Sequence, residues 1–136
     1  KWTTYRVMAS DTLDVLELEV FSRSPRACIT ANYPLSGGDE SMREQFRVAT
    51  KALGLSEATH QHLWETYGSN GFALLQDDLQ LVHPDLPYIN SEIEYLKQHE
   101  MATCWDDVLM RRWGLGLRNQ RLCEEIKGIK KEAFAS

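Results

Sequence analysis

Hydrophobic residues recur every three or four positions along most of the chain, which is the period of an α-helix. In residues 3–20 the apolar positions form one face and acidic residues fill most of the others. We therefore predict a helix here, capped at its start by the hydroxyl of Thr3 or Thr4. The apolar face of this predicted helix consists of Tyr5, Met8, Ala9, Leu13, Leu16 and Val20.

Residues 21–39 have a different character, because they hold Pro, Gly and Ser residues and lack a helical period. We predict a connecting segment here, with a short extended piece at residues 27–31. The helical period returns at Glu40 and continues to the C-terminal end. Gly54 and Gly68 are natural helix stops, Ser56 is a natural start, and Pro87 suits the first position of a later helix.

A capping box is predicted at Thr103 and Asp106, with the hydroxyl on one amide and the carboxylate reaching back. No strand alternation or internal repeat is visible, so the predicted class is all-α. We expect a small orthogonal bundle of five to six helices plus one N-terminal helix. The residues predicted to face its core are Met42, Phe46, Ala49, Leu53, Leu63, Trp64, Tyr67, Ile89, Ile93, Leu96, Trp105, Val108, Leu109, Trp113, Leu122, Ile126 and Ile129.

Composition narrows the class of protein. The 136 residues are 43% hydrophobic and 10% aromatic, which excludes a disordered chain and suits one domain. No apolar run approaches the roughly 18 residues that a membrane-spanning helix needs. A formal net charge of -5 disfavours nucleic acid as a partner. The chain begins Lys1-Trp2 without an initiator Met, so we expect a processed protein or a piece of a longer one.

The titratable residues offer little catalytic chemistry by themselves. The three cysteines are widely spaced, which argues against disulfides and structural zinc and favours buried thiols in a reducing cytosol. His60 and His62 point to different faces of a helix, and we expect both on a solvated surface. The Asp106-Asp107 pair, like Asp77-Asp78, is interpreted as helix capping. His99, Glu100 and Cys104 are separated by a predicted helix start, so we expect no metal site.

Two sets of motifs resemble a known family. Residues 1–9, Lys-Trp-Thr-Thr-Tyr-Arg-Val-Met-Ala, resemble the stretch that closes the flavin domain of FAD-dependent glycerol-3-phosphate dehydrogenases. The second set is similar, in order and spacing, to the C-terminal helical domain of these dehydrogenases and of the related glycerophosphate oxidases. It consists of Tyr67-Gly68-Ser69, Leu86-Pro87-Tyr88-Ile89, Glu92-Ile93-Glu94-Tyr95, His99-Glu100-Met101-Ala102 and Asp106-Asp107-Val108-Leu109-Met110-Arg111-Arg112. The family usually continues with Thr-Arg-Leu, whereas this chain has Trp113-Gly114-Leu115.

This resemblance implies a domain organisation and a parent activity. Residues 1–21 correspond to the last helix of an FAD-binding domain, residues 22–40 to a linker, and residues 41–136 to the C-terminal helical domain. The parent enzyme would oxidise sn-glycerol 3-phosphate to dihydroxyacetone phosphate, passing electrons to FAD and then to quinone. Two alternatives remain open: a glycerophosphate oxidase that uses oxygen, and an independent helical module for protein interaction.

The resemblance also suggests roles for individual residues. By their position in the family motif, Lys1, Trp2 and Thr3 would lie near the flavin and the substrate in the parent, where a lysine and a helix N-terminus would stabilise negative charge. The alternatives are a solvated terminus for Lys1 and plain helix capping for Thr3. The resemblance transfers no role to Arg111 and Arg112, for which we expect salt bridges to carboxylates of a neighbouring helix, with docking against the flavin domain as the alternative. Arg6 is a candidate for pairing either with a local carboxylate or with the flavin domain.

The isolated fragment is expected to contain no catalytic residue, to bind no FAD or metal, and to be inactive. Its main expected partner is the upstream FAD-binding domain of the same polypeptide, and homodimerisation is left open. The predicted location is cytoplasmic, with peripheral attachment of the parent to the inner membrane also left open.

Overall fold

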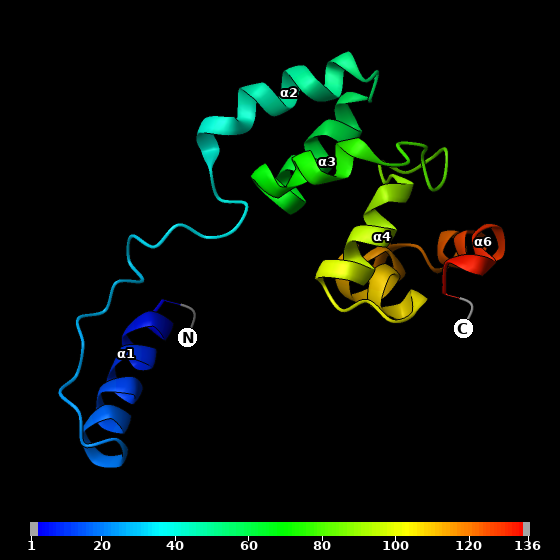
Figure 1. Ribbon diagram of the computed structural model, residues 1–136. Coiled ribbons are helices and arrows are strands. Elements are labelled where there is room, and N and C mark those ends of the chain that lie inside the picture. The colour runs from blue at the N-terminus through cyan, green and yellow to red at the C-terminus, as the bar shows by residue number, and fades with distance from the viewer. Residues whose placement is uncertain (1–2, 135–136) are drawn as a thin grey trace. The chain divides into compact units, whose positions relative to one another are not determined.

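A computed structural model describes residues 3–134, which form two compact units (Figure 1). We call residues 1–35 unit 1 and residues 36–136 unit 2. The all-α prediction is confirmed, since no β-strand is formed within residues 3–134. The extended pairing in that range is limited to an isolated antiparallel bridge between Leu81 and Ile89.

Unit 1 contains one helix and a returning segment. Helix α1 (Tyr5–Val15) continues as a π-helical turn, η1 (Leu16–Val20), so the predicted helix is confirmed. The predicted cap is wrong in its chemistry, because Thr4 occupies the N-cap position without a capping hydrogen bond from its side chain. The chain then returns beside the helix, where Arg26 donates to Glu17 at 3.0 Å and Arg6 donates to the Thr30 carbonyl at 2.6 Å.

The apolar face of α1 has no core beneath it within unit 1. None of residues 3–35 is buried, and Leu13 and Val20 are 61% and 63% exposed. Short isolated helices are marginal in water, and burial of an amphipathic face normally supplies most of their stability. Unit 1 as described therefore presents a hydrophobic surface that it does not itself bury.

Unit 2 carries the hydrophobic core and most of the helices. The 3-10 turn η2 (Glu40–Met42) leads into α2 (Arg43–Ala52), and α3 (Glu57–Tyr67) leads into the 3-10 segment η3 (Gly68–Gln76). The prediction that Ser56 opens a helix is confirmed, since its hydroxyl accepts the Thr59 amide at 3.1 Å. The remaining elements are α4 (Asn90–His99), the π-helix η4 (Asp107–Arg112), α5 (Leu115–Arg118), α6 (Gln120–Ile129) and the 3-10 turn η5 (Lys131–Phe134).

Two predicted helix starts are corrected. Helix α4 begins at Asn90 rather than Pro87, because the Tyr88 carbonyl accepts the Val82 amide in an extended pairing. At the next start, Asp107 rather than Asp106 accepts the Thr103 amide, at 2.8 Å. The predicted capping box is therefore displaced by one residue.

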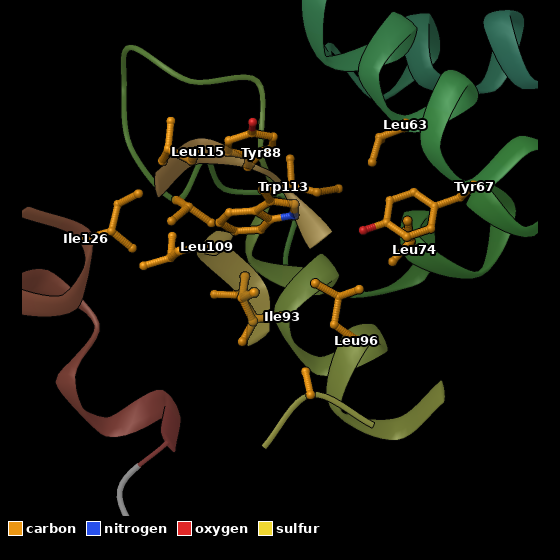
Figure 2. Close-up of a cluster of buried hydrophobic side chains, with 14 of the residues drawn as sticks. Leu63, Tyr67, Leu74, Tyr88, Ile93, Leu96, Leu109, Trp113, Leu115 and Ile126 are labelled. Atoms are coloured by element: carbon orange, nitrogen blue, oxygen red, sulfur yellow. The ribbon is translucent and has the colours of Figure 1, made fainter. Parts of the chain in front are cut away.

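The core of unit 2 is built mainly from predicted positions, with two exceptions. Leu53 and Ile129 are 48% and 62% exposed, so their predicted burial is wrong. Both stand at the end of a helix, where the chain leaves the packed face. Figure 2 shows the cluster that α3, α4 and the later helices share. Its fully buried large side chains include Phe46, Leu63, Leu74, Ile89, Leu96, Val108, Leu109 and Ile126.

Candidate functional site

A buried carboxylate lies at the first turn of α4. Glu92 is 0% exposed, and three groups donate to it. The Ile89 amide is 2.8 Å from one carboxylate oxygen, as expected for an acidic residue in the third position of a helix. The Tyr67 hydroxyl lies 2.9 Å from the other oxygen, and the His62 Nε2 atom lies 2.7 Å from that same oxygen. These partners provide the hydrogen bonds that a buried carboxylate requires.

Tyr67 is held in its protonated form by this arrangement. Burial raises the pKa of its hydroxyl far above the usual range, and the negative charge of Glu92 raises it further. The Trp113 indole N–H, buried and without a hydrogen-bond partner in the part of the chain that is described, points toward the same hydroxyl (Figure 2). Tyr67 is therefore a permanent donor to Glu92 and not a candidate proton acceptor at physiological pH.

The two histidines of α3 do not lie on a solvated surface, so that prediction is wrong. His60 is 8% exposed, and its Nδ1 atom lies 3.0 Å from the buried Thr50 hydroxyl on α2. His62 is half-buried against Glu92. Helix α3 is packed on both flanks, so two histidines on different faces each meet a neighbouring element rather than water. The His-x-His spacing alone does not show this.

An open cleft of about 370 Å³ lies beside His62. The Tyr88 ring stands edge-on to the His62 ring at 4.7 Å and is stacked on Trp113 at 4.2 Å with an interplanar angle of 6°. These packed rings give the cleft a rigid floor. The lining residues are Ala58, Gln61, His62, Glu65, Thr66, Pro87, Tyr88, Arg112, Trp113 and Arg118.

The predicted site residues are placed as follows. Lys1 and Trp2 lie outside the described residues, and Thr3 is exposed. Besides its bond to the Thr30 carbonyl, Arg6 lies 3.0 Å from the Tyr5 hydroxyl.

Arg111 and Arg112 both form salt bridges, but to different carboxylates. The Arg111 partner is Asp107 at 2.7 Å, one turn earlier on the same helix. The Arg112 partner is Glu100 at 2.9 Å, at the end of α4. Although the two arginines are adjacent in sequence, Arg111 pairs within its own helix and Arg112 pairs with the end of α4.

The cysteines are partly as predicted. All three are free, but only Cys123 is buried, while Cys28 and Cys104 are exposed. The expectation of three buried thiols is therefore wrong at two positions. Cys28 lies in unit 1, where a hydrogen bond from the Thr30 side chain lowers the pKa of its thiol below the usual value.

Comparison with known proteins identifies the family. The sequence profile of the C-terminal domain of alpha-glycerophosphate oxidase matches residues 28–129, which is most of the chain. The chain belongs to this family.

The curated proteins that this chain resembles are much longer than the chain. A probable mitochondrial glycerol-3-phosphate dehydrogenase of Caenorhabditis elegans is 30% identical over 93% of this chain and 19% of its own length. A probable mitochondrial glycerol-3-phosphate dehydrogenase of Dictyostelium discoideum is 33% identical over 82% of the chain and 18% of its own length. The chain thus spans about a fifth of these relatives. No solved structure matches it significantly.

Residues 3–134 lack the arrangement by which dinucleotide-binding folds hold FAD. Dinucleotides are held where a strand passes through a glycine-rich turn into a helix, and residues 3–134 contain no strand and therefore no such turn. In the same range no three His, Cys, Asp or Glu side chains are grouped to hold a metal ion. Among the described helices, none is both long and apolar enough to cross a membrane.

Proposed function

We propose that this chain is the C-terminal helical domain of an FAD-dependent glycerol-3-phosphate dehydrogenase. In this proposal the parent enzyme oxidises sn-glycerol 3-phosphate to dihydroxyacetone phosphate, with electrons passing to FAD and then to quinone. Support comes from two relatives that are named as probable glycerol-3-phosphate dehydrogenases. They match 93% and 82% of this chain. The catalytic parts would lie in the remaining four-fifths of such an enzyme.

The proposed role of the chain itself is docking and assembly rather than catalysis. The observation that carries it is the uncovered apolar face of α1, where Tyr5 and Leu13 are 56% and 61% exposed. This face and the returning segment border an open cavity of about 850 Å³ within unit 1. An apolar surface of this kind marks a site where another protein surface packs. The proposed occupant is the rest of the upstream FAD-binding domain, whose last helix residues 1–21 are expected to form.

Deletion of residues 41–136 from the full-length parent, which leaves the apolar face of α1 in place, tests whether the helical domain itself contributes to assembly. The expected result is a lower melting temperature or defective assembly while the FAD absorbance of the purified enzyme is retained. Loss of FAD from an enzyme that still assembles normally would contradict the proposal. The isolated 136-residue chain, titrated with FAD, should show no saturable binding, and a measurable affinity would overturn its non-catalytic assignment.

A second candidate, a glycerophosphate oxidase, differs from the first in its electron acceptor and also has support. The matching profile carries the name of an oxidase, whereas the named relatives are dehydrogenases. Peroxide production by the full-length parent under air would favour the oxidase. Quinone reduction without peroxide would favour the dehydrogenase, which we propose as the first candidate.

Fractionation of cells expressing the parent tests its proposed cytoplasmic location and its peripheral attachment to the inner membrane.

A further inference from the structure

We propose that the cleft between α3 and Arg118 binds a small molecule through a phosphomonoester group. This site lies entirely in unit 2, and it is independent of the docking role and the parent activity proposed above. Its volume of about 370 Å³ falls at the lower end of the roughly 300–1,000 Å³ that is usual for small-molecule sites. The lining combines polar and apolar groups and includes two arginine side chains.

Arg118 is the central residue of the proposed site. Its Nε atom lies 3.3 Å from the Gly114 carbonyl oxygen, and its Nη2 atom lies 2.7 Å from the Trp113 carbonyl oxygen and 3.0 Å from the Tyr88 hydroxyl. All of these partners in residues 3–134 are neutral oxygens, so the positive charge is not compensated by a bound carboxylate there. The Nη1 hydrogens remain available as donors, because a guanidinium carries five N–H groups.

A guanidinium fixed along one edge is well suited to a phosphate. The planar fork of arginine matches phosphate oxygens, and less conformational entropy is lost when the side chain is already held in place. The side chain is held against Tyr88, which is itself stacked on Trp113. The cleft therefore presents an exposed positive charge whose guanidinium is hydrogen-bonded along one edge.

A second arginine adds donors to the same cleft. Arg112 contacts Glu100 through its Nε and Nη2 atoms, which leaves its Nη1 hydrogens available in the same way. The Thr66 hydroxyl lies 3.3 Å from the His62 Nδ1 atom and donates to it, because the other ring nitrogen of His62 donates to Glu92, so Thr66 adds no donor to the cleft. Guanidinium groups are well suited to phosphate oxygens, because each presents several N–H donors in one plane.

One lining residue opposes anion binding and gives the proposal a sharp test. Glu65 is the carboxylate among the lining residues, and it accepts a hydrogen bond from Gln61 at 2.7 Å. Its charge should weaken binding of a phosphate dianion by Coulomb repulsion across the cleft. Removal of this charge should therefore strengthen binding, an effect that a purely structural role of Arg118 does not predict.

The experiment is a titration of the whole 136-residue chain with inorganic phosphate at constant ionic strength, followed by NMR of the arginine Nε–H groups and by calorimetry. We expect saturable binding that Arg118→Gln weakens at least about tenfold, as for loss of a charge-assisted hydrogen bond. Arg111→Gln is the matched control, since Arg111 contacts Asp107 and does not line the cleft. Glu65→Gln should strengthen binding several-fold, and it keeps the test valid if Arg118→Gln does not fold.

Two further arms identify the source of the phosphomonoester: glycerol phosphate in solution, and vesicles containing phosphatidate. Arg118-dependent binding in either arm supports the site and shows whether its ligand is a soluble metabolite or a lipid headgroup. Equal phosphate binding by Arg118→Gln and Arg111→Gln overturns the proposal. Unchanged or weaker binding by Glu65→Gln also overturns it.

Discussion

The Tyr67 hydroxyl donates a 2.9 Å hydrogen bond to the fully buried carboxylate of Glu92. This contact joins the end of α3 to the first turn of α4 across 25 residues of sequence. Because the carboxylate is removed from water, each of its donors carries more weight than the same bond would at the surface. The stability of unit 2 should therefore depend on this small polar network as well as on its apolar core.

Replacement of the hydroxyl tests that dependence. Tyr67→Phe keeps the ring in the core and removes one donor to a buried charge, so we expect a loss of about 1.5–3 kcal/mol in the free energy of unfolding. Urea denaturation of both chains measures it. Tyr95→Phe is the matched control, because the Tyr95 ring packs against Tyr67 at 5.3 Å and its hydroxyl makes no hydrogen bond to another of the described side chains. Equal losses in the two variants would show that the Tyr67 bond has no special weight.

Gly68 should tolerate replacement by alanine less well than Gly54. It has a φ of +54°, and a methyl group at this position would overlap the Gly37 carbonyl oxygen, which accepts the Ser69 amide at 2.9 Å. Gly68→Ala therefore adds a steric clash of about 1–3 kcal/mol to the left-handed backbone penalty of about 1–2 kcal/mol. Gly54→Ala, with a φ of +75° and open space around it, should show the backbone penalty alone. Thermal unfolding that ranks the two variants equally would contradict the predicted clash.

A third glycine should give the opposite result. Gly128 lies inside α6, and a methyl group added there would meet no atom within 4 Å. Alanine has the higher helix propensity, so Gly128→Ala should stabilise unit 2 by about 0.5–1 kcal/mol. An upward shift of the melting temperature is the expected measurement. A downward shift would mean that the end of α6 has a contact that the isolated chain does not show.

The helical period of the hydrophobic residues predicted the all-α class and most of the core residues. It could do so because the apolar stripe that a helix buries recurs at a fixed local spacing. It did not predict the environment of His62, because the partner of this side chain is Glu92, 30 residues away. The sequence pattern around a polar residue on the flank of a helix is the same whether its side chain faces water or a buried carboxylate. The cleft at Arg118 was missed for the same reason, since its walls come from three separate segments. The interpretation of Arg112 as a salt-bridging residue needed only a nearby carboxylate, and Glu100 provides it.

The displacement of the capping interaction from Asp106 to Asp107 has the same origin. Sequence spacing alone allows either carboxylate to reach back, and the choice depends on the backbone geometry at the helix start. In the structure one Asp107 oxygen accepts the Thr103 amide at 2.8 Å, the Thr103 hydroxyl at 3.0 Å and the Cys104 amide at 3.3 Å. Asp106 instead lies 3.4 Å from Lys127.

These contacts make the stability of the η4 region dependent on pH. The bond from the Thr103 amide, followed by that from its hydroxyl, lowers the pKa of Asp107 from 3.8 to about 2. When the pKa of a carboxyl group is lower in the folded state than in the unfolded state, the ionised group stabilises the folded state at pH values above the unfolded-state pKa. This stabilisation is lost as the pH falls through the folded-state pKa. The contribution of Asp107 should therefore be complete above about pH 4 and should disappear toward pH 2.

The measurement compares the chain with its Asp107→Asn variant by urea denaturation from pH 7 to pH 2, with the carboxyl titration followed by ¹³C NMR. The difference in unfolding free energy should be constant at neutral pH and shrink below about pH 4, where the unfolded carboxyl begins to protonate before the folded one. Asp106→Asn, which leaves the Thr103 contacts intact, should be the less destabilised variant at pH 7. A difference between chain and Asp107→Asn that persists unchanged to pH 2 would show that the side-chain amide, not the lost charge, is responsible. An Asp107 titration midpoint near 3.8 would show that the hydrogen bonds from Thr103 to this carboxylate do not form in solution.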